Sequence, residues 1–210
     1  MVHVSEAGVM GVHVIEGLDT AHIIEILGAC KQPYDDSMLY SAGADAKFVG
    51  KSTRLSKFRA IVDQRLFDAT AAMLSRISAA DTDHDYILVR NDVTQIVYEA
   101  GGFFRAHADF LSLATNFVEE QTLLVCITPP AIARDTRGGA TTIHANGTSV
   151  DFVATTIPGH ALLFRKDHEH EGQVVREGEK HMCGRTARHP ARLSSSPSRE
   201  RPRKRPAAAI

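Results

Sequence analysis

The sequence predicts an α+β fold, in which N-terminal helices support a double-stranded β-helix, or jelly-roll barrel, of antiparallel strands. Three observations lead to this fold class. Apolar residues recur at helical spacing before about residue 80, and short β-prone runs separated by turn residues follow from about residue 86. Two adjacent turn residues, Asn146 and Gly147, join two of these runs. Helices followed by tightly connected strands are typical of a sheet that is covered by helices on one face.

Two helices are expected in the first part of the chain. Asp19 and Thr20 are suitable caps for a helix from Ala21 to about Lys31. A longer helix is expected over about 55–78, because apolar residues recur there every three to four positions, at Phe58, Val62, Leu66, Ala69, Met73 and Ile77.

Strands are expected in one run before the helices, 10–16, and in seven runs after them: Tyr86–Arg90, Val93–Tyr98, Thr122–Thr128, Ala140–Ala145, Ser149–Thr155, Ala161–Arg165 and Gln173–Arg176. Asn146-Gly147 predicts a hairpin turn between two of them, because both residues tolerate positive φ. With Thr148 they also form a glycosylation sequon, but the hairpin is preferred because no secretory signal is expected. The stretch 32–53 is rich in Gly, Ser, Asp and Lys, and is expected to be a loop that lines a substrate entrance or a plain surface loop.

Length and composition indicate one domain with a sizeable core, since 43% of the 210 residues are apolar. No apolar run reaches about 18 residues, so no membrane-spanning helix is expected. The N-terminus lacks a basic stretch followed by a long apolar one, which favours the cytoplasm or the nucleus. Cys30, Cys126 and Cys183 are scattered without pairing motifs, so we expect reduced thiols.

The composition changes at Gly184. Residues 184–210 contain eight basic residues, one acidic residue and four prolines, whereas residues 1–183 contain 16 basic and 24 acidic residues. We therefore expect a folded domain over 1–183 and a disordered basic tail over 184–210. The cluster Arg201–Arg205 suits a nuclear-import or nucleic-acid-binding arm, and equally a merely solvated tail.

Candidate metal ligands are His107 and Asp109, together with His170 farther along the chain. In an extended segment residues two apart project to the same side, whereas a helix separates them by roughly 200°. Two imidazoles and one carboxylate can occupy one face of an octahedral Fe(II) and leave the remaining positions for an organic cosubstrate and O2. A single His-x-Asp pair is a weak signal, and spacing alone does not choose between His170 and His168.

Four sequence blocks, in order, resemble the prolyl 4-hydroxylase-like 2-oxoglutarate/Fe(II) dioxygenases. Together they cover roughly residues 90–183. The family patterns are Y-x-x-G-x-x-F-x-x-H-x-D, G-G-E-T-x-F, P-x-x-G-D-A-L-x-F and H-E-G followed by G-x-K, and the matching segments here are Tyr98–Asp109, Gly138–Ile143, Pro158–Phe164 and His170–Lys180. An ordered set of blocks is far more specific than any one of them.

The resemblance implies a role for each matched residue. His107, Asp109 and His170 would hold Fe(II), and the family pattern selects His170 over His168. Lys180 would bind the distal carboxylate of the cosubstrate 2-oxoglutarate, with help from the hydroxyls of Tyr98 and Thr141. The resemblance also implies O2 as oxidant and L-ascorbate as a reductant.

The position of Lys180 agrees with this role independently of the family. It lies ten residues beyond His170, so after a turn it can return on a neighbouring antiparallel strand toward the same cavity. A dicarboxylate needs a cation at its far end, and a lysine removed from water favours an anionic partner. The alternative is an exposed strand lysine.

The chain departs from the family pattern at several positions. Cys126 stands where the family often has tyrosine, Ala140 replaces the glutamate of G-G-E-T, and His160 replaces an acidic residue. After Cys183 the family strand does not continue recognisably, so we expect a curtailed last barrel strand.

The sequence thus favours a 2-oxoglutarate- and Fe(II)-dependent dioxygenase that hydroxylates an unactivated C–H bond, with peptidyl proline as substrate by analogy only. One alternative is a catalytically inactive jelly-roll binding module whose basic tail binds nucleic acid or directs nuclear import. Another is a nucleic-acid demethylase, although that class usually supplies an arginine where Lys180 stands.

Overall fold

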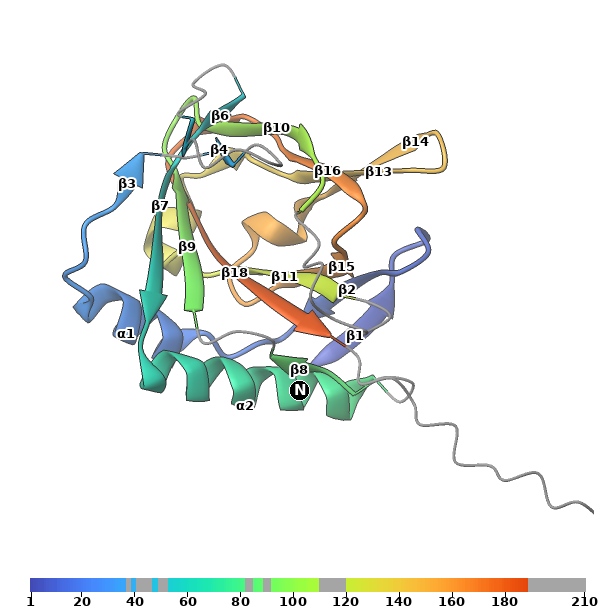
Figure 1. The fold of residues 1–210 in the computed structure, drawn as a ribbon, viewed down its shortest axis with the longest axis horizontal. Helices are drawn as coiled ribbons and strands as arrows, with labels where there is room; N and C mark the ends of the chain where they lie inside the picture. The colour runs from blue at the N-terminus through green and yellow to red at the C-terminus, as the bar shows by residue number, and fades with distance from the viewer. Residues whose placement is uncertain are drawn as a thin grey trace, which may run out of the picture.

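The computed structural model describes residues 1–36, 39–40, 47–48, 53–81, 85–88, 92–109 and 120–188. Within them, two antiparallel sheets dominate the fold (Figure 1). The larger sheet runs in the order β1 (His3–Glu6), β2 (Val12–Glu16), β15 (Ala161–Arg165), β11 (Glu120–Cys126), β18 (Lys180–Arg188), β9 (Asp92–Tyr98), β7 (Lys57–Val62) and β3 (Asp35–Asp36), with β8 (Ile87–Leu88) also paired to β18.

The smaller sheet runs in the order β14 (Thr148–Phe152), β13 (Thr141–Ala145), β16 (Glu169–Gly172), β10 (Phe103–His107) and β6 (Arg54–Leu55). Two short ribbons accompany it: β12 (Arg137–Gly138) with β17 (Val175–Glu177), and β4 (Leu39–Tyr40) with β5 (Lys47–Phe48). The helices are α1 (Ala21–Ala29), α2 (Gln64–Ala80), the short α3 (Pro130–Ala133) and the 3-10 turn η1 (Val153–Thr156).

The larger sheet is the middle layer of the fold. Strand β15 shows why, because its residues are buried on both faces. Leu163 belongs to the core shared with the helices, whereas Leu162 and Phe164 belong to the core shared with Ile143 and Phe152 of the smaller sheet. The space between the two sheets is therefore lined by side chains from both.

The two longer helices lie along the outer face of the larger sheet (Figure 1). The first expected helix corresponds to α1, Ala21–Ala29. The expectation of a helix over 55–78 is wrong for its first part, because residues 57–62 form β7 and pair with β9. The alternate residues Arg59 and Ile61 are buried in β7, as in a strand, and Asp63 then starts α2 by accepting a hydrogen bond from the Arg65 amide.

The predicted hairpin between β13 and β14 is confirmed. Ala145 pairs with Thr148 across a two-residue turn, in which Asn146 and Gly147 have φ of 50° and 75°. The expected strand Ser149–Thr155 is shorter, since β14 ends at Phe152 and η1 follows. Of the stretch 32–53, the described parts include the short strands β3, β4 and β5, and the rest lies outside the described residues.

The C-terminal boundary expected at residue 183 is wrong. Strand β18 has nine residues, and those from Met182 to Arg188 are paired with β11, so the last strand is not curtailed. Gly184 also pairs with Thr94 of β9, and the buried Arg185 donates a hydrogen bond to the Thr70 hydroxyl of α2. Composition fails here because a strand in the middle of a sheet is held by backbone pairing on both sides, which small and basic residues also provide. Residues 189–210 lie outside the described residues.

The three cysteines are free thiols, and Cys126 and Cys183 are buried. Among the described residues, every helix is too short or too polar to cross a lipid bilayer.

Candidate metal centre

The expected ligands His107, Asp109 and His170 are brought together by the smaller sheet. His107 is the last residue of β10 and is paired directly with His170 of β16, while Asp109 follows β10 by two residues. The Asp109 Oδ1 atom lies 3.9 Å from Nε2 of His107 and 4.0 Å from Nε2 of His170. The three donor atoms lie within 4.8 Å of one another, and they form the one such group among the described residues.

The hydrogen bonds of the two imidazoles fix which nitrogen faces this centre. Nδ1 of His107 lies 2.8 Å from the Arg105 carbonyl oxygen, and Nδ1 of His170 lies 3.0 Å from the His168 carbonyl oxygen. A carbonyl oxygen only accepts, so each Nδ1 carries the proton and each Nε2 keeps its lone pair for a ligand. This is the arrangement that metal-bound histidines adopt.

The carboxylate is oriented in the same way. Thr122 of β11 donates its hydroxyl proton to Oδ2 of Asp109, which leaves Oδ1 turned toward the imidazoles. Two donor atoms on neighbouring positions of an octahedral ion, each at about 2.1 Å, are about 3 Å apart. The donor set of two imidazoles and one carboxylate suits a divalent metal, and side-chain movements of about 1 Å would bring Asp109 Oδ1 and the two Nε2 atoms to that spacing.

Aromatic rings enclose the imidazoles. Phe104 stacks on His107 with ring centroids 3.5 Å apart, and Phe164 meets His170 edge-on at 4.7 Å. The guanidinium of Arg54 lies 4.4 Å from the Phe104 ring centroid on the β6 side. Burial, followed by the charge of His170, lowers the pKa of His107 to about 4, so His107 is neutral and able to bind metal near pH 7.

His168 is not part of this group. Its Nε2 atom lies 3.7 Å from where a side chain on Gly11 would begin, near β2. The structure thus brings His170 to the centre and leaves His168 outside it, as the family pattern indicates.

A second cluster surrounds Lys180, at the start of β18. Lys180 is paired with Tyr98 of β9 and is only 3% exposed. Its ammonium donates hydrogen bonds to the Gly139 carbonyl and, at 3.2 Å, to the Thr155 hydroxyl. Thr141 is also buried, and its hydroxyl oxygen lies 3.0 Å from that of Thr155. We call Lys180, Tyr98, Thr141 and Thr155 the Lys180 cluster.

The ammonium of Lys180 has no carboxylate partner among the described residues, where lysines form ion pairs only between Lys57 and Glu99 and between Lys166 and Glu120. The alternative interpretation, an exposed strand lysine, is therefore wrong. Burial lowers the pKa of Lys180 to about 8, because the charged form loses water. Buried charges in proteins are usually paired, so this ammonium has the chemistry to accept an anionic partner.

Tyr98 connects the Lys180 cluster to the metal ligands. Its ring centroid lies 5.7 Å from the Lys180 Nζ atom, and its hydroxyl lies 3.6 Å from where a side chain on Gly172 would begin. Gly172 is two residues, roughly 7 Å, along β16 from His170 and on the same face. Burial raises the pKa of Tyr98, so its phenol remains a proton donor.

Thr122 and Thr155 are absent from the residues singled out in the sequence. Thr122 falls in an expected strand, and Thr155 falls at the end of another that proves to be η1. No sequence signal distinguishes them from other strand threonines. The strands that carry the histidines, β10 and β16, also lie outside the expected runs.

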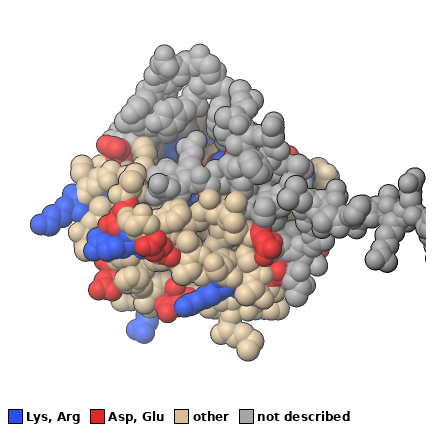
Figure 2. Space-filling view, turned by 60° about the horizontal axis from the view of Figure 1, so that its bottom comes forward, with Lys and Arg blue, Asp and Glu red and all other residues tan. Residues whose placement is uncertain are grey.

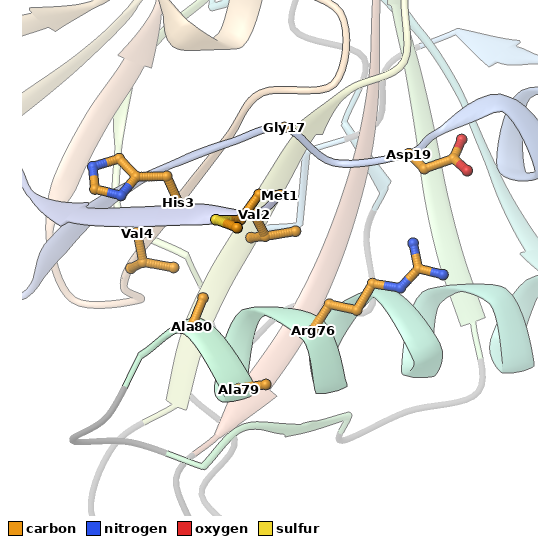
Figure 3. A pocket seen from close by; sticks show the side chains of 9 residues that line it. All are labelled: Met1, Val2, His3, Val4, Gly17, Asp19, Arg76, Ala79 and Ala80. Carbon is orange, nitrogen blue, oxygen red and sulfur yellow. The ribbon is translucent and has the colours of Figure 1, made fainter.

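A depression elsewhere on the molecule, between β1 and α2, lacks comparable chemistry (Figure 3). Most of the side chains that line it are small or apolar, and His3, Asp19 and Arg76 are its polar members. On the face that carries α2, the acidic and basic side chains of the described residues are interspersed and form no single charged patch (Figure 2). Neither feature competes with the centre between the sheets.

No protein-family model matches the chain, and no curated protein sequence matches it. Solved structures do match the chain. A Burkholderia pseudomallei oxidoreductase of the 2OG-Fe(II) oxygenase family is 16% identical with a TM-score of 0.52, over 85% of each chain. The viral collagen prolyl hydroxylase of Paramecium Bursaria Chlorella virus-1, a 2OG complex, is 16% identical with a TM-score of 0.55, over 85% of this chain and 96% of that one.

A Trichoplax adhaerens prolyl hydroxylase, in complex with a hypoxia inducible factor oxygen degradation domain peptide fragment, is 14% identical with a TM-score of 0.57, over 84% of this chain and 83% of that one. The chain therefore has the fold of 2-oxoglutarate/Fe(II) oxygenases, a jelly-roll fold made mostly of β-sheet.

Proposed function

We propose that this protein is a 2-oxoglutarate- and Fe(II)-dependent dioxygenase that hydroxylates an unactivated C–H bond. One observation carries the proposal: two imidazoles and a carboxylate converge between the sheets, and a buried ammonium without a carboxylate partner lies in the same layer. The first set suits Fe(II), and the second suits the far end of a dicarboxylate. Neither the metal-ligand set nor the buried ammonium alone would distinguish this function from other metal or anion binding.

His107 and His170 would hold Fe(II) through Nε2, and Asp109 would hold it through Oδ1. When bound, Fe(II) supplies the activation of O2 that couples oxidative decarboxylation of 2-oxoglutarate to insertion of one oxygen atom into a C–H bond. The chain's own contribution is orientation: two backbone carbonyls and the Thr122 hydroxyl hold the three ligands in place.

The Lys180 cluster would hold the cosubstrate. The Lys180 ammonium and the hydroxyls of Tyr98 and Thr141 would donate to the distal carboxylate, and a charge-assisted hydrogen bond of this kind contributes about 1.5–3 kcal/mol. Gly172, which lies beside the Tyr98 hydroxyl, is roughly 7 Å along β16 from His170, a separation comparable to the length of an extended five-carbon diacid. Burial of the Lys180 cluster would exclude water from the distal end of the ligand, whereas His107 and Asp109 at the metal end are only partly buried.

We further propose peptidyl proline as the substrate and L-ascorbate as the reductant. The support is analogy: two of the structures with this fold are prolyl hydroxylases, and one of them holds a peptide fragment. The acting compartment would be the cytoplasm or the nucleus.

Anaerobic titration with Fe(II) and 2-oxoglutarate tests the proposal. The wild-type protein should develop the visible charge-transfer band that a 2-oxo acid gives when it chelates Fe(II), and should form succinate once O2 is admitted. His170→Ala should lose both signals. His168→Ala is the matched control, because it removes a histidine two residues away that lies outside the centre, and it should keep both. A folded wild-type protein without the band would overturn the proposal.

The alternative of an inactive binding module loses part of its support in this structure. It draws on a curtailed last strand, but β18 is nine residues long and is paired with β11 from Met182 to Arg188. The basic cluster Arg201–Arg205, through which such a module would bind nucleic acid, lies outside the described residues.

A further inference from the structure

Thr155 is a fully buried threonine in the short 3-10 turn η1. Strand β14 ends at Phe152, and the 3-10 turn η1 leads on toward β15. This turn places Thr155 between the sheets with 0% exposure, whereas the next residue, Thr156, is only partly buried. Both hydroxyls donate to the backbone carbonyl three residues earlier, and the Thr155 hydroxyl also reaches Lys180 and Thr141.

The hydroxyl of Thr155 is surrounded by three polar atoms. Its oxygen lies 3.2 Å from Lys180 Nζ, 3.0 Å from Thr141 Oγ1 and 3.3 Å from the Phe152 carbonyl oxygen. An ammonium only donates, so the Thr155 hydroxyl accepts from Lys180 and can donate to the Phe152 carbonyl or to the Thr141 oxygen. Donation to Thr141 leaves the hydroxyl hydrogen of Thr141 for an anion. One hydroxyl therefore contacts both a cation and a neighbouring donor of the Lys180 cluster.

We propose that Thr155 is a positioning residue that sets how tightly and how selectively the Lys180 cluster binds a dicarboxylate. This inference rests on the proposed function and deepens it. Thr155 fixes the ammonium of Lys180 and the hydroxyl of Thr141 before the ligand arrives, so that both point at one carboxylate.

The physical reason is the freedom of a lysine side chain. Four rotatable bonds let an unrestrained ammonium adopt many positions, and fixing it on ligand binding costs entropy. Gly139 and Thr155 engage two of its three N–H groups, which leaves the third for an anion. Removing the Thr155 hydroxyl frees the ammonium and leaves one buried N–H group without an acceptor.

Two 2-oxo acids of equal carbon number separate this role from a general structural one. 2-Oxoglutarate has the distal carboxylate, and 2-oxopentanoate has a methyl group in its place. Both chelate a metal through the same end, so only 2-oxoglutarate should depend on the Lys180 cluster. The dissociation constant of each acid is measured from the anaerobic charge-transfer band in Fe(II)-loaded protein.

Thr155→Val, which keeps the shape and loses the hydroxyl, should raise the dissociation constant of 2-oxoglutarate by about ten-fold, the loss of one charge-assisted hydrogen bond. The dissociation constant of 2-oxopentanoate should change by less than about two-fold. Thr155→Ser should restore wild-type binding. Thr156→Val is the matched control, since Thr156 makes the same backbone hydrogen bond without touching Lys180. It should leave both constants unchanged.

Equal weakening of the two acids in Thr155→Val would overturn the inference and assign Thr155 to packing, and so would unchanged binding of both. If Thr155→Val does not fold, Thr155→Ala provides the same comparison. Absence of the band in the wild-type protein with either acid is a different result, because it rejects the proposed function itself.

Discussion

At the scale of single residues, the metal centre is organised by atoms that never touch the metal. The carbonyls of Arg105 and His168 select the tautomer of each imidazole, and Thr122 selects the free oxygen of Asp109. Two of these partners are backbone atoms and cannot be removed by substitution. Thr122 is the one accessible to mutation.

Thr122→Val should therefore weaken Fe(II) binding by about 10–100-fold, the usual cost of losing a partner of a metal ligand. Metal titration followed by quenching of intrinsic tyrosine fluorescence would measure it. Thr148→Val, which loses a hydroxyl at the distant β13–β14 turn, is the control and should bind Fe(II) normally. Identical affinities for the two variants would show that Thr122 does not orient Asp109.

Burial of the charged Lys180 side chain lowers stability, a cost that the proposed cosubstrate binding would offset. Its folded-state pKa is lowered from 10.5 to about 8, so between these values the unfolded chain binds more protons than the folded chain. The free energy of unfolding should therefore rise with pH across this window, and the penalty of the buried ammonium is fully present below pH 8.

Lys180→Met should remove this rise of the free energy of unfolding with pH. Below pH 8 it should also stabilise the protein by about 1–4 kcal/mol, because it removes a buried charge that lacks a carboxylate partner. Urea denaturation at several pH values measures both effects. Lys57→Met, at a half-exposed lysine, is the control and should keep the wild-type slope. A Lys180→Met protein that is less stable at every pH, with the slope unchanged, would contradict this account.

At the scale of elements, β18 connects three other strands of the larger sheet. It pairs with β11 along seven residues, with β9 over its first half and with β8 at its end. Its first residue is Lys180, and its last five residues continue the sheet well beyond the site. The strand therefore contributes both to the Lys180 cluster and to the core over α2.

Truncation distinguishes the strand from the tail. A chain ending at residue 188 should unfold within about 2 °C of the full-length protein, since it keeps every described pairing. A chain ending at residue 183 should fail to fold cooperatively, because it loses paired backbone on both sides of a central strand and the Arg185 contact with α2. Thermal unfolding followed by circular dichroism decides between them. Equal melting temperatures would show that residues 184–188 do not stabilise the sheet.

At the scale of the whole molecule, function depends on the layering of two sheets. The metal ligands come from the smaller sheet and the segment after it, while Lys180, Tyr98 and Thr122 come from the larger one. The helices cover the opposite face of the larger sheet (Figure 1) and contribute no ligand. The site is thus a property of the interface between the sheets.

The sequence by itself determined what is encoded by spacing over a few residues or by an ordered set of motifs. The alternation that puts His107 and Asp109 on one side, the position of Lys180 after His170 and the Asn146-Gly147 turn are local features. They do not depend on which other strand lies alongside, so they can be interpreted before any fold is known.

Only the tertiary structure decided the rest. Residues 57–62 follow helical periodicity but form β7, since pairing with β9 outweighs local propensity. Residues 184–188 resemble a tail in composition but complete a central strand. Thr122 and Thr155 gain their roles from partners 13 and 25 residues away, Asp109 and Lys180. Such partners come into contact only when the two sheets pack. The residue pattern of one segment does not indicate which side chains of the opposite sheet it will contact.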